Sequence, residues 1–153
     1  MASTLLATGL AVFVVFSLIL VFFAPQILAI FNGGQNFSEV DMNLMANLMR
    51  IIVIGQLIYI VGTFFSAMLQ SYNHFFIPGI ATAFYNVGII IGILLFHQYF
   101  GIYAAPYGII LGAIIFVVLQ LPLARKVGFS FVSSYSFLKS AGLNRVFMLM
   151  WPR

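Results

Sequence analysis

Long, uninterrupted runs of apolar residues dominate the pattern of hydrophobic and polar positions along this chain. Three of them read GLAVFVVFSLILVFFA, VGIIIGILLF and GIILGAIIFVVLQL. A membrane-spanning strand alternates apolar and polar residues over about ten positions, whereas continuous runs of this length are typical of helices. Polar residues and turn formers separate the runs, so we predict four helices, each long enough to span a membrane, over 5–27, 43–69, 76–96 and 103–123.

Composition identifies lipid as the solvent of these helices. Hydrophobic residues make up 64% of the 153 positions and charged residues 5%, against about 45–50% and about 25% in soluble domains. A water-soluble fold of this length would have to expose a largely apolar surface. We therefore expect an all-α fold, a polytopic membrane bundle of four transmembrane helices followed by the start of a fifth.

The basic residues indicate how the chain is oriented. Because Lys and Arg near helix ends stay on the cytoplasmic side, both termini are expected in the cytoplasm and the loops at 32–42 and 97–100 outside. Segment 124–145 is expected to lie as an amphipathic segment along the inner surface, and 146–153 is interpreted as a truncated helix start. Five of the six basic residues follow the last span, among them Arg125, Lys126, Lys139 and Arg145.

Caps and prolines mark the helix ends. Ser38 or Asp41 is placed to cap the second helix, since acceptors at this position bind free N–H groups of the first turn. Pro78 and Pro106 fall in first turns, where a missing N–H is harmless. Two further prolines lie near helix ends and are interpreted as kinks or exits: Pro25 and Pro122.

Arg50 is the one charged residue inside a predicted span. A charge at depth costs about 2.5–3.5 kcal/mol on insertion scales, so the side chain is a candidate for a polar cavity or a substrate contact. Its long stem equally allows it to reach the outer headgroups or to pair with Glu39 or Asp41. Four other polar side chains in the spans could line a pathway or bond a neighbouring helix: Gln56, Ser66, Asn86 and Gln120.

Small residues predict where helices pack closely. Gly88 and Gly92 in the third span, and Gly108 and Gly112 in the fourth, each form a G-x-x-x-G pair on one helix face. Such faces bring two backbones together, within one chain or between two copies, and packing within the chain is favoured. The aromatic residues over 99–107 are expected to anchor the outer interface.

The sequence carries no catalytic constellation. Glu39 and Asp41 are its only carboxylates, and His74 and His97 are expected on opposite faces of the membrane. It has no Cys, no Walker-type glycine loop and no H-E-x-x-H motif. Six basic residues are too few for the dense stripe of a nucleic-acid-binding protein. We expect no enzyme, no cofactor, no metal site and no nucleic-acid partner, but contact with membrane lipids.

The order and spacing of several segments resemble one transporter family. In chain order the segments are FFAPQILAIF, NLMRIIVI and FSAMLQSYNHFFIPGIATAFYNVGIIIG. A glycine-bearing helix comes next, and it is followed by LQLPLARKVGF and RVFMLMWP. This combination resembles the MurJ/MviN lipid II flippases of the multidrug/oligosaccharidyl-lipid/polysaccharide exporter superfamily. The resemblance implies that the chain is a fragment corresponding to helices three to six of a fourteen-helix transporter with two lobes.

The resemblance also implies a function in cell wall biogenesis. Members of the family move lipid II, the undecaprenyl-pyrophosphate-linked peptidoglycan precursor, across the bacterial cytoplasmic membrane by alternating access. That substrate and the remaining helices of the transporter are the implied partners. The family's cavity arginines lie mainly in other helices, and only Arg50 maps onto an intramembrane charge here. Two alternatives remain, a capsule or O-antigen type lipid-linked polysaccharide exporter of the same superfamily and a self-standing four-helix structural subunit.

Overall fold

The structure is a computed structural model that describes residues 2–31 and 38–128. Nearly all of these residues lie in helices. No strand occurs within these ranges, so the predicted all-α class is confirmed. The segment expected at 146–153, and all but the first residues of 124–145, lie outside the described residues. In chain order the helices are α1 (Ala2–Phe22), α2 (Ala24–Phe31), α3 (Glu39–Ser71), α4 (Phe76–Phe100), the short 3-10 helix η1 (Gly101–Tyr103) and α5 (Ala104–Lys126).

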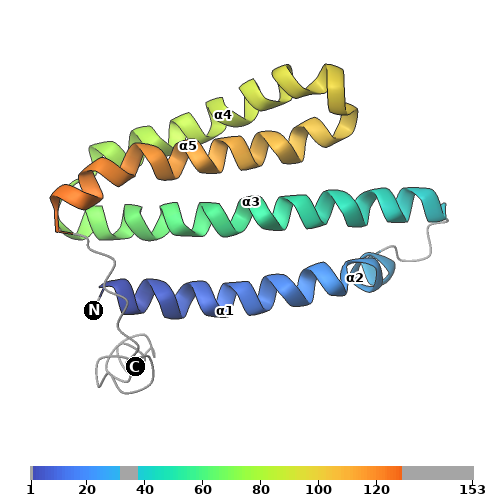
Figure 1. Cartoon of the computed structure of the whole chain (residues 1–153), viewed down its shortest axis with the longest axis horizontal. Helices are drawn as coiled ribbons and strands as arrows, with labels where there is room; N and C mark the ends of the chain where they lie inside the picture. Colours follow the sequence, from blue (N-terminus) through green and yellow to red (C-terminus); the bar gives the residue numbers. More distant parts are fainter. Residues whose placement is uncertain (1, 32–37, 129–153) are drawn as a thin grey trace.

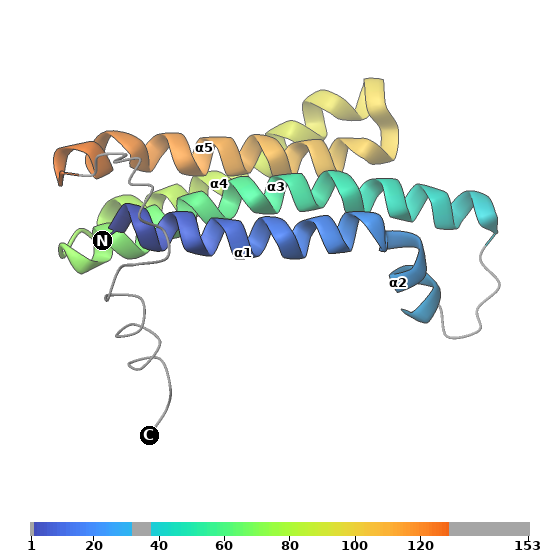
Figure 2. The same cartoon turned by 60° about the horizontal axis from the view of Figure 1, so that its bottom comes forward.

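The helices form an antiparallel bundle in which α3 lies between α1 and the hairpin of α4 and α5 (Figure 1). Figure 2 shows the same neighbours from a second direction. The beginning of α1 and the end of α5 lie at one end of the bundle, beside the turn from α3 to α4. The turn from α4 to α5 lies at the opposite end. α4 packs chiefly on α5, and α3 contacts α5 far more than α4.

Long apolar helices make this chain a multi-pass membrane protein. Two stretches are long and apolar enough to cross a membrane, Glu39–Ser71 and Phe76–Lys126, and the bent pair Gly9–Phe22 and Ala24–Ile30 is a third if it forms one span. The second stretch reverses direction at η1, so it is a hairpin rather than one rod. Its halves α4 and α5 have 25 and 23 residues, and each exceeds the roughly 20 residues that a bilayer requires.

The first span differs from its prediction. The pattern predicts one helix over 5–27, but the structure breaks the helix at Phe23 and turns α2 by 71° from α1. Pro25 explains the break, because it has no N–H for the carbonyl four residues earlier and its ring clashes with that turn. Of the two outcomes that the sequence left open for Pro25, the structure has the kink.

The remaining helices run beyond their predicted limits. α3 begins at Glu39 rather than at 43, because the Ser38 hydroxyl oxygen accepts the N–H of Asp41 at 3.2 Å and caps the helix. α5 continues through Pro122 to Lys126, so this proline is not an exit. Apolar runs locate the part of a helix inside hydrocarbon, whereas the helix itself extends into the polar zone. The 33 residues of α3 correspond to about 50 Å, against a hydrocarbon core of about 30 Å.

The outer surface of the bundle is apolar. Large side chains such as Phe22, Leu94 and Phe76 are about three-quarters exposed. The interior instead holds small side chains and a few large ones, among them Phe65 and Phe116. Lipid-facing helices require this distribution, because tight helix contacts in a membrane depend on small residues rather than on hydrophobic burial.

Candidate functional site

The polar candidates of the membrane helices do not meet in one site. Arg50 and Gln56 line separate cavities between α1 and α3. Gln120 is buried beside α3, and Asn86 is exposed on α4. Each therefore needs its own account.

Arg50 is half-buried where α3 passes the end of α1. Its Nε donates to the backbone carbonyl of Val21 at 3.4 Å, and its Nη1 donates to Oδ1 of Asn47 at 3.0 Å. Asp41 lies nine residues earlier on α3, about 14 Å along the axis. The guanidinium thus bonds to a neighbouring backbone and to its own helix.

The cavity beside Arg50 has a volume of about 270 Å³. Apart from the guanidinium its polar wall consists of Ser17, which is 9% exposed. The other lining side chains are aliphatic: Val14, Leu18, Val21, Val53, Ile54 and Leu57. The cavity is therefore lined mostly by hydrocarbon groups, and the guanidinium of Arg50 is the one positive charge among the described residues of its wall.

A second cavity between α1 and α3, of about 480 Å³, carries more polar groups. α3 contributes Gln56, Tyr59 and Thr63 to its wall, and α1 contributes Gly9 and Phe13. Positions 56, 59 and 63 share one helix face because they are three and four residues apart. The Gln56 side chain is exposed, so its carboxamide is accessible from this cavity.

Gln120 has no access to any pathway, because its exposed fraction is 0%. Its Oε1 accepts the hydroxyl of Ser66 on α3 at 2.7 Å, and its Nε2 donates to the carbonyl of Phe116 at 2.9 Å. Both ends of the carboxamide are satisfied, and the first bond ties α5 to α3. Asn86 also bonds within the protein, since its Nδ2 donates to the carbonyl of Thr82 at 3.2 Å.

The four G-x-x-x-G residues lie at the seam between α4 and α5. A Cβ on Gly88 would lie 2.7 Å from the Cα of Gly112, and a Cβ on Gly92 would overlap the Cα of Gly108. The obstacles are backbone atoms, so the two helices approach as closely as their main chains allow. In this seam Gly88 is paired with Gly112, and Gly92 with Gly108, within one chain.

Two further glycines, missed by the sequence analysis, form a similar seam between α3 and α5. A Cβ on Gly55 would lie 2.9 Å from Cγ2 of Ile109, and a Cβ on Gly62 would overlap the ring of Phe116. They are seven residues apart and so share one helix face. That spacing was the available signal, since it places both glycines on one face without forming a G-x-x-x-G motif.

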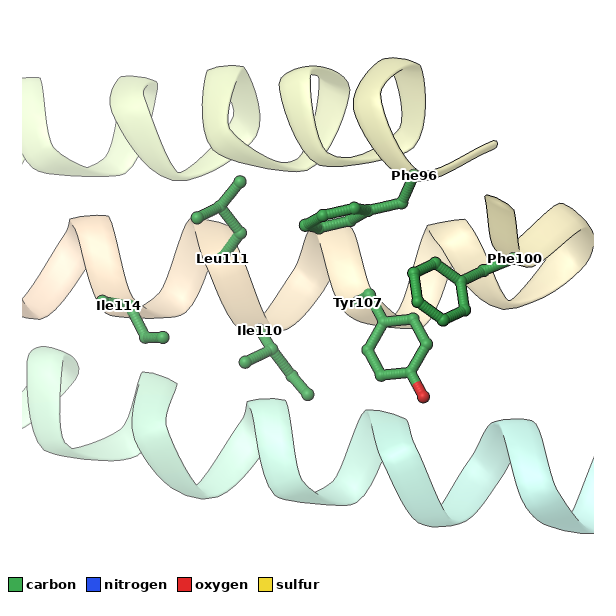
Figure 3. Close-up of a pocket in the computed structure, with 6 residues that line it drawn as sticks. All are labelled: Phe96, Phe100, Tyr107, Ile110, Leu111 and Ile114. Carbon is green, nitrogen blue, oxygen red and sulfur yellow. The ribbon is translucent and has the colours of Figure 1, made fainter. Parts of the chain in front are cut away.

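Aromatic side chains connect the helices further. The ring of Tyr59 stacks on Phe116 with centroids 4.9 Å apart, and Tyr85 of α4 lies 4.7 Å from Tyr59. Near the α4–α5 turn an apolar cavity of about 320 Å³ opens between the helices, as Figure 3 shows. Its lining residues are Phe96, Phe100, Tyr107, Ile110, Leu111 and Ile114. Phe100 and Tyr107 lie next to each other in this wall, with ring centroids 5.1 Å apart.

The ionisable groups lie mostly at the ends of the bundle. Glu39 and Asp41 begin α3, whereas Arg125 and Lys126 end α5 at the opposite end. His74, in the turn from α3 to α4, and His97, near the end of α4, also lie at opposite ends of the bundle. Among the described residues no three His, Cys, Asp or Glu side chains are grouped so that they could hold a metal ion. The described residues thus form closely packed helices with cavities between them.

Comparison with known proteins gives one consistent result. The family described as "Lipid II flippase MurJ" matches residues 1–153. A protein of Borreliella burgdorferi is 31% identical over 67% of this chain and 20% of its own length. A protein of Buchnera aphidicola subsp. Schizaphis graminum is 28% identical over 94% of this chain and 27% of its own length. Both are named "Probable lipid II flippase MurJ".

The chain spans about a quarter of the length of these relatives, from 20% to 27%. A third relative of the same name, from Buchnera aphidicola subsp. Acyrthosiphon pisum, is 27% identical over 86% of the chain and 26% of its own length. No solved structure gives a significant match. With the family matched over all 153 residues, this chain belongs to the MurJ family of lipid II flippases.

Proposed function

We propose that this chain supplies four helices of one lobe of a transporter that moves lipid II from the inner to the outer leaflet of the bacterial cytoplasmic membrane. The observation that carries the proposal is the family match over residues 1–153. The relatives extend well beyond the matched region. The remaining helices of such a transporter are therefore the proposed partners of this segment.

The physical task explains why one segment is not sufficient. A pyrophosphate-bearing headgroup crosses hydrocarbon only inside a polar cavity that replaces its water. In the described residues the cavity with Gln56 and Thr63 is the best candidate for part of such a wall. Arg50 adds a single positive charge, and its guanidinium already donates hydrogen bonds to the Val21 carbonyl and the Asn47 side chain. Other helices would have to supply the remaining cationic groups.

The proposed orientation places both ends of the chain in the cytoplasm. Arg125 and Lys126 lie at the end of the bundle where α1 begins, and the acidic start of α3 lies at the other end. Positive charge near helix ends favours the cytoplasmic side. In this orientation the α4–α5 turn faces outward. The transporter would act by alternating access of its two lobes, without forming or breaking a covalent bond.

Growth of a depleted bacterium tests the proposal. Residues 1–153 replace the matching segment of a full-length relative, and the chimera is expressed in cells whose own lipid II flippase is switched off. We expect growth, because the segment supplies the same helices. A matched chimera that carries Gly92→Leu should not support growth, since the added side chain would push α4 away from α5. If the unaltered chimera reaches the membrane and cells still lyse, the proposal is wrong.

A further inference from the structure

Pro25 leaves one backbone carbonyl of α1 without its helical donor. In a continuous α-helix the carbonyl of Val21 would accept the N–H of residue 25, and proline has none. The chain bends by 71° at this point. On both sides of the bend the series of helical backbone hydrogen bonds continues. The N–H of Phe23 donates to the carbonyl of Ile19, and the N–H of Ile27 donates to the carbonyl of Phe23, each at 2.9 Å. The Val21 carbonyl therefore lacks its usual donor in this series.

A side chain of α3 supplies the missing donor. Nε of Arg50 donates to the Val21 carbonyl at 3.4 Å. Nη1 of the same guanidinium donates to Oδ1 of Asn47 at 3.0 Å, three residues earlier on α3. The second bond fixes the plane of the guanidinium and therefore the direction of Nε–H. Apart from Ser17, the other side chains that line the nearby cavity are aliphatic, as at Val53 and Leu57.

We propose that Arg50 is a positioning residue that fixes the bend between α1 and α2 by replacing the N–H that Pro25 lacks. Asn47 orients the guanidinium for this bond. A backbone carbonyl in hydrocarbon must find an internal partner, and a charged donor makes a stronger bond than a neutral one. The cation also lies at the C-terminal end of α1, where the helix dipole is negative. All three effects hold α2 at one angle to α1.

The acidic residues of α3 do not compete for this arginine. Glu39 and Asp41 lie eleven and nine residues before Arg50, about 17 and 14 Å away along the helix. The bent arm α2 packs on α3. Fixing the bend therefore fixes how the first span enters the bundle. This role concerns the shape of the chain and holds whatever substrate the transporter carries.

The bend can be measured directly because the chain has no native Cys. Spin labels at Val12→Cys on α1 and Ala29→Cys on α2, both exposed, report the angle in the complete chain in nanodiscs. At a rise of 1.5 Å per residue a straight helix separates these positions by about 26 Å, and the 71° bend shortens this to about 21 Å. Arg50→Met keeps an unbranched stem that reaches about as far as Nε and removes the donors. We expect a broader distance distribution whose mean moves toward the straight value. Gln56→Met on the same helix is the control and should leave the distribution unchanged.

A second-site change separates this role from general damage. Pro25→Ala restores the N–H, so Arg50→Met in that background should neither broaden the distribution nor lower the thermal stability further. If Arg50→Met does not fold alone, it should fold together with Pro25→Ala. Three results would overturn the proposal. Arg50→Met could show the same distance distribution as the parent chain, or it could broaden the distribution equally with and without Pro25. Alternatively, Arg50→Met could fail to fold both alone and together with Pro25→Ala.

Discussion

Gln120 shows how a single residue holds two helices together inside the membrane. Its carboxamide is completely buried, and its Oε1 accepts the Ser66 hydroxyl at 2.7 Å. The sequence identified both residues as polar positions in spans but could not pair them, because they are 54 residues apart. A polar side chain in a span is compatible with a pathway or with a helix contact, and only the fold decides between the two.

The bond between Ser66 and Gln120 should be visible as an energetic coupling. Ser66→Ala leaves Oε1 of Gln120 buried without its donor. We therefore expect a loss of about 0.6–1.7 kcal/mol in unfolding free energy. In a Gln120→Met background the same change should have almost no effect, since no acceptor remains. Unfolding in mixed micelles, followed by circular dichroism, measures the stability of the parent chain, the two single variants and the double variant. Ser71→Ala serves as control, because that hydroxyl bonds only one turn back to Met68 at an exposed site. Equal losses in both backgrounds would remove this bond from the account.

At the scale of helices, two glycine seams determine which elements touch. α4 meets α5 through backbone atoms at Gly92 and Gly108, whereas Gly62 of α3 meets the ring of Phe116 on α5. The first seam was readable from the G-x-x-x-G spacing. The second has only the seven-residue spacing of Gly55 and Gly62 as a signal, which indicates a shared helix face but not the side chains of α5 that the glycines meet. The two seams should respond differently to an added methyl group.

Gly92→Ala should separate α4 from α5. The new Cβ would overlap the Cα of Gly108, and a backbone cannot rotate away. We expect a loss of about 1–3 kcal/mol, as for other overpacked contacts. Gly79→Ala on the same helix meets nothing within 4 Å and should be neutral or stabilising by up to about 1 kcal/mol. The same unfolding measurement compares them, and similar stabilities of the two variants would contradict the backbone contact.

Gly62→Ala should be rescued by a smaller neighbour. Its new Cβ would overlap the ring of Phe116, which is a side chain and can be shortened. We expect Gly62→Ala to destabilise the chain, and Phe116→Leu to restore part of the loss. Phe116→Leu should not rescue Gly92→Ala, which serves as the matched control. Equal rescue of both variants, seen as equal shifts in melting temperature, would show that the α3–α5 seam is not packed as described.

At the scale of the whole molecule, the alternation of helices places chemically different residues at the two ends. The acidic start of α3 and the α4–α5 turn lie at one end, and the α3–α4 turn and the basic end of α5 lie at the other. The up-and-down order follows from the apolar runs, so it could be predicted from sequence. The bend between α1 and α2 and its contact with Arg50 could not, because they depend on a contact between residues 29 positions apart.

Thiol labelling should reveal the orientation in the membrane. Gln98 and Gln70 are exposed glutamines near opposite ends of the bundle, and the chain has no native Cys. An impermeant reagent added outside intact cells should label Gln98→Cys and spare Gln70→Cys, because the basic end stays in the cytoplasm. Permeabilised cells provide the control, since both variants should then react. The reverse pattern would invert the proposed orientation.

Transport of lipid II in reconstituted vesicles is the decisive test of the proposed function. A full-length relative whose matching segment is replaced by residues 1–153 is placed in liposomes with a fluorescent lipid II analogue, and an impermeant quencher reports which leaflet holds it. We expect flipping by this chimera, and none above empty liposomes by the 153-residue chain alone. Within the described membrane helices, the chain alone offers a pyrophosphate one guanidinium away from the helix ends, that of Arg50, which already bonds to Val21 and Asn47. An inert chimera beside an active parent, or flipping by the chain alone, would show that the proposed function is wrong.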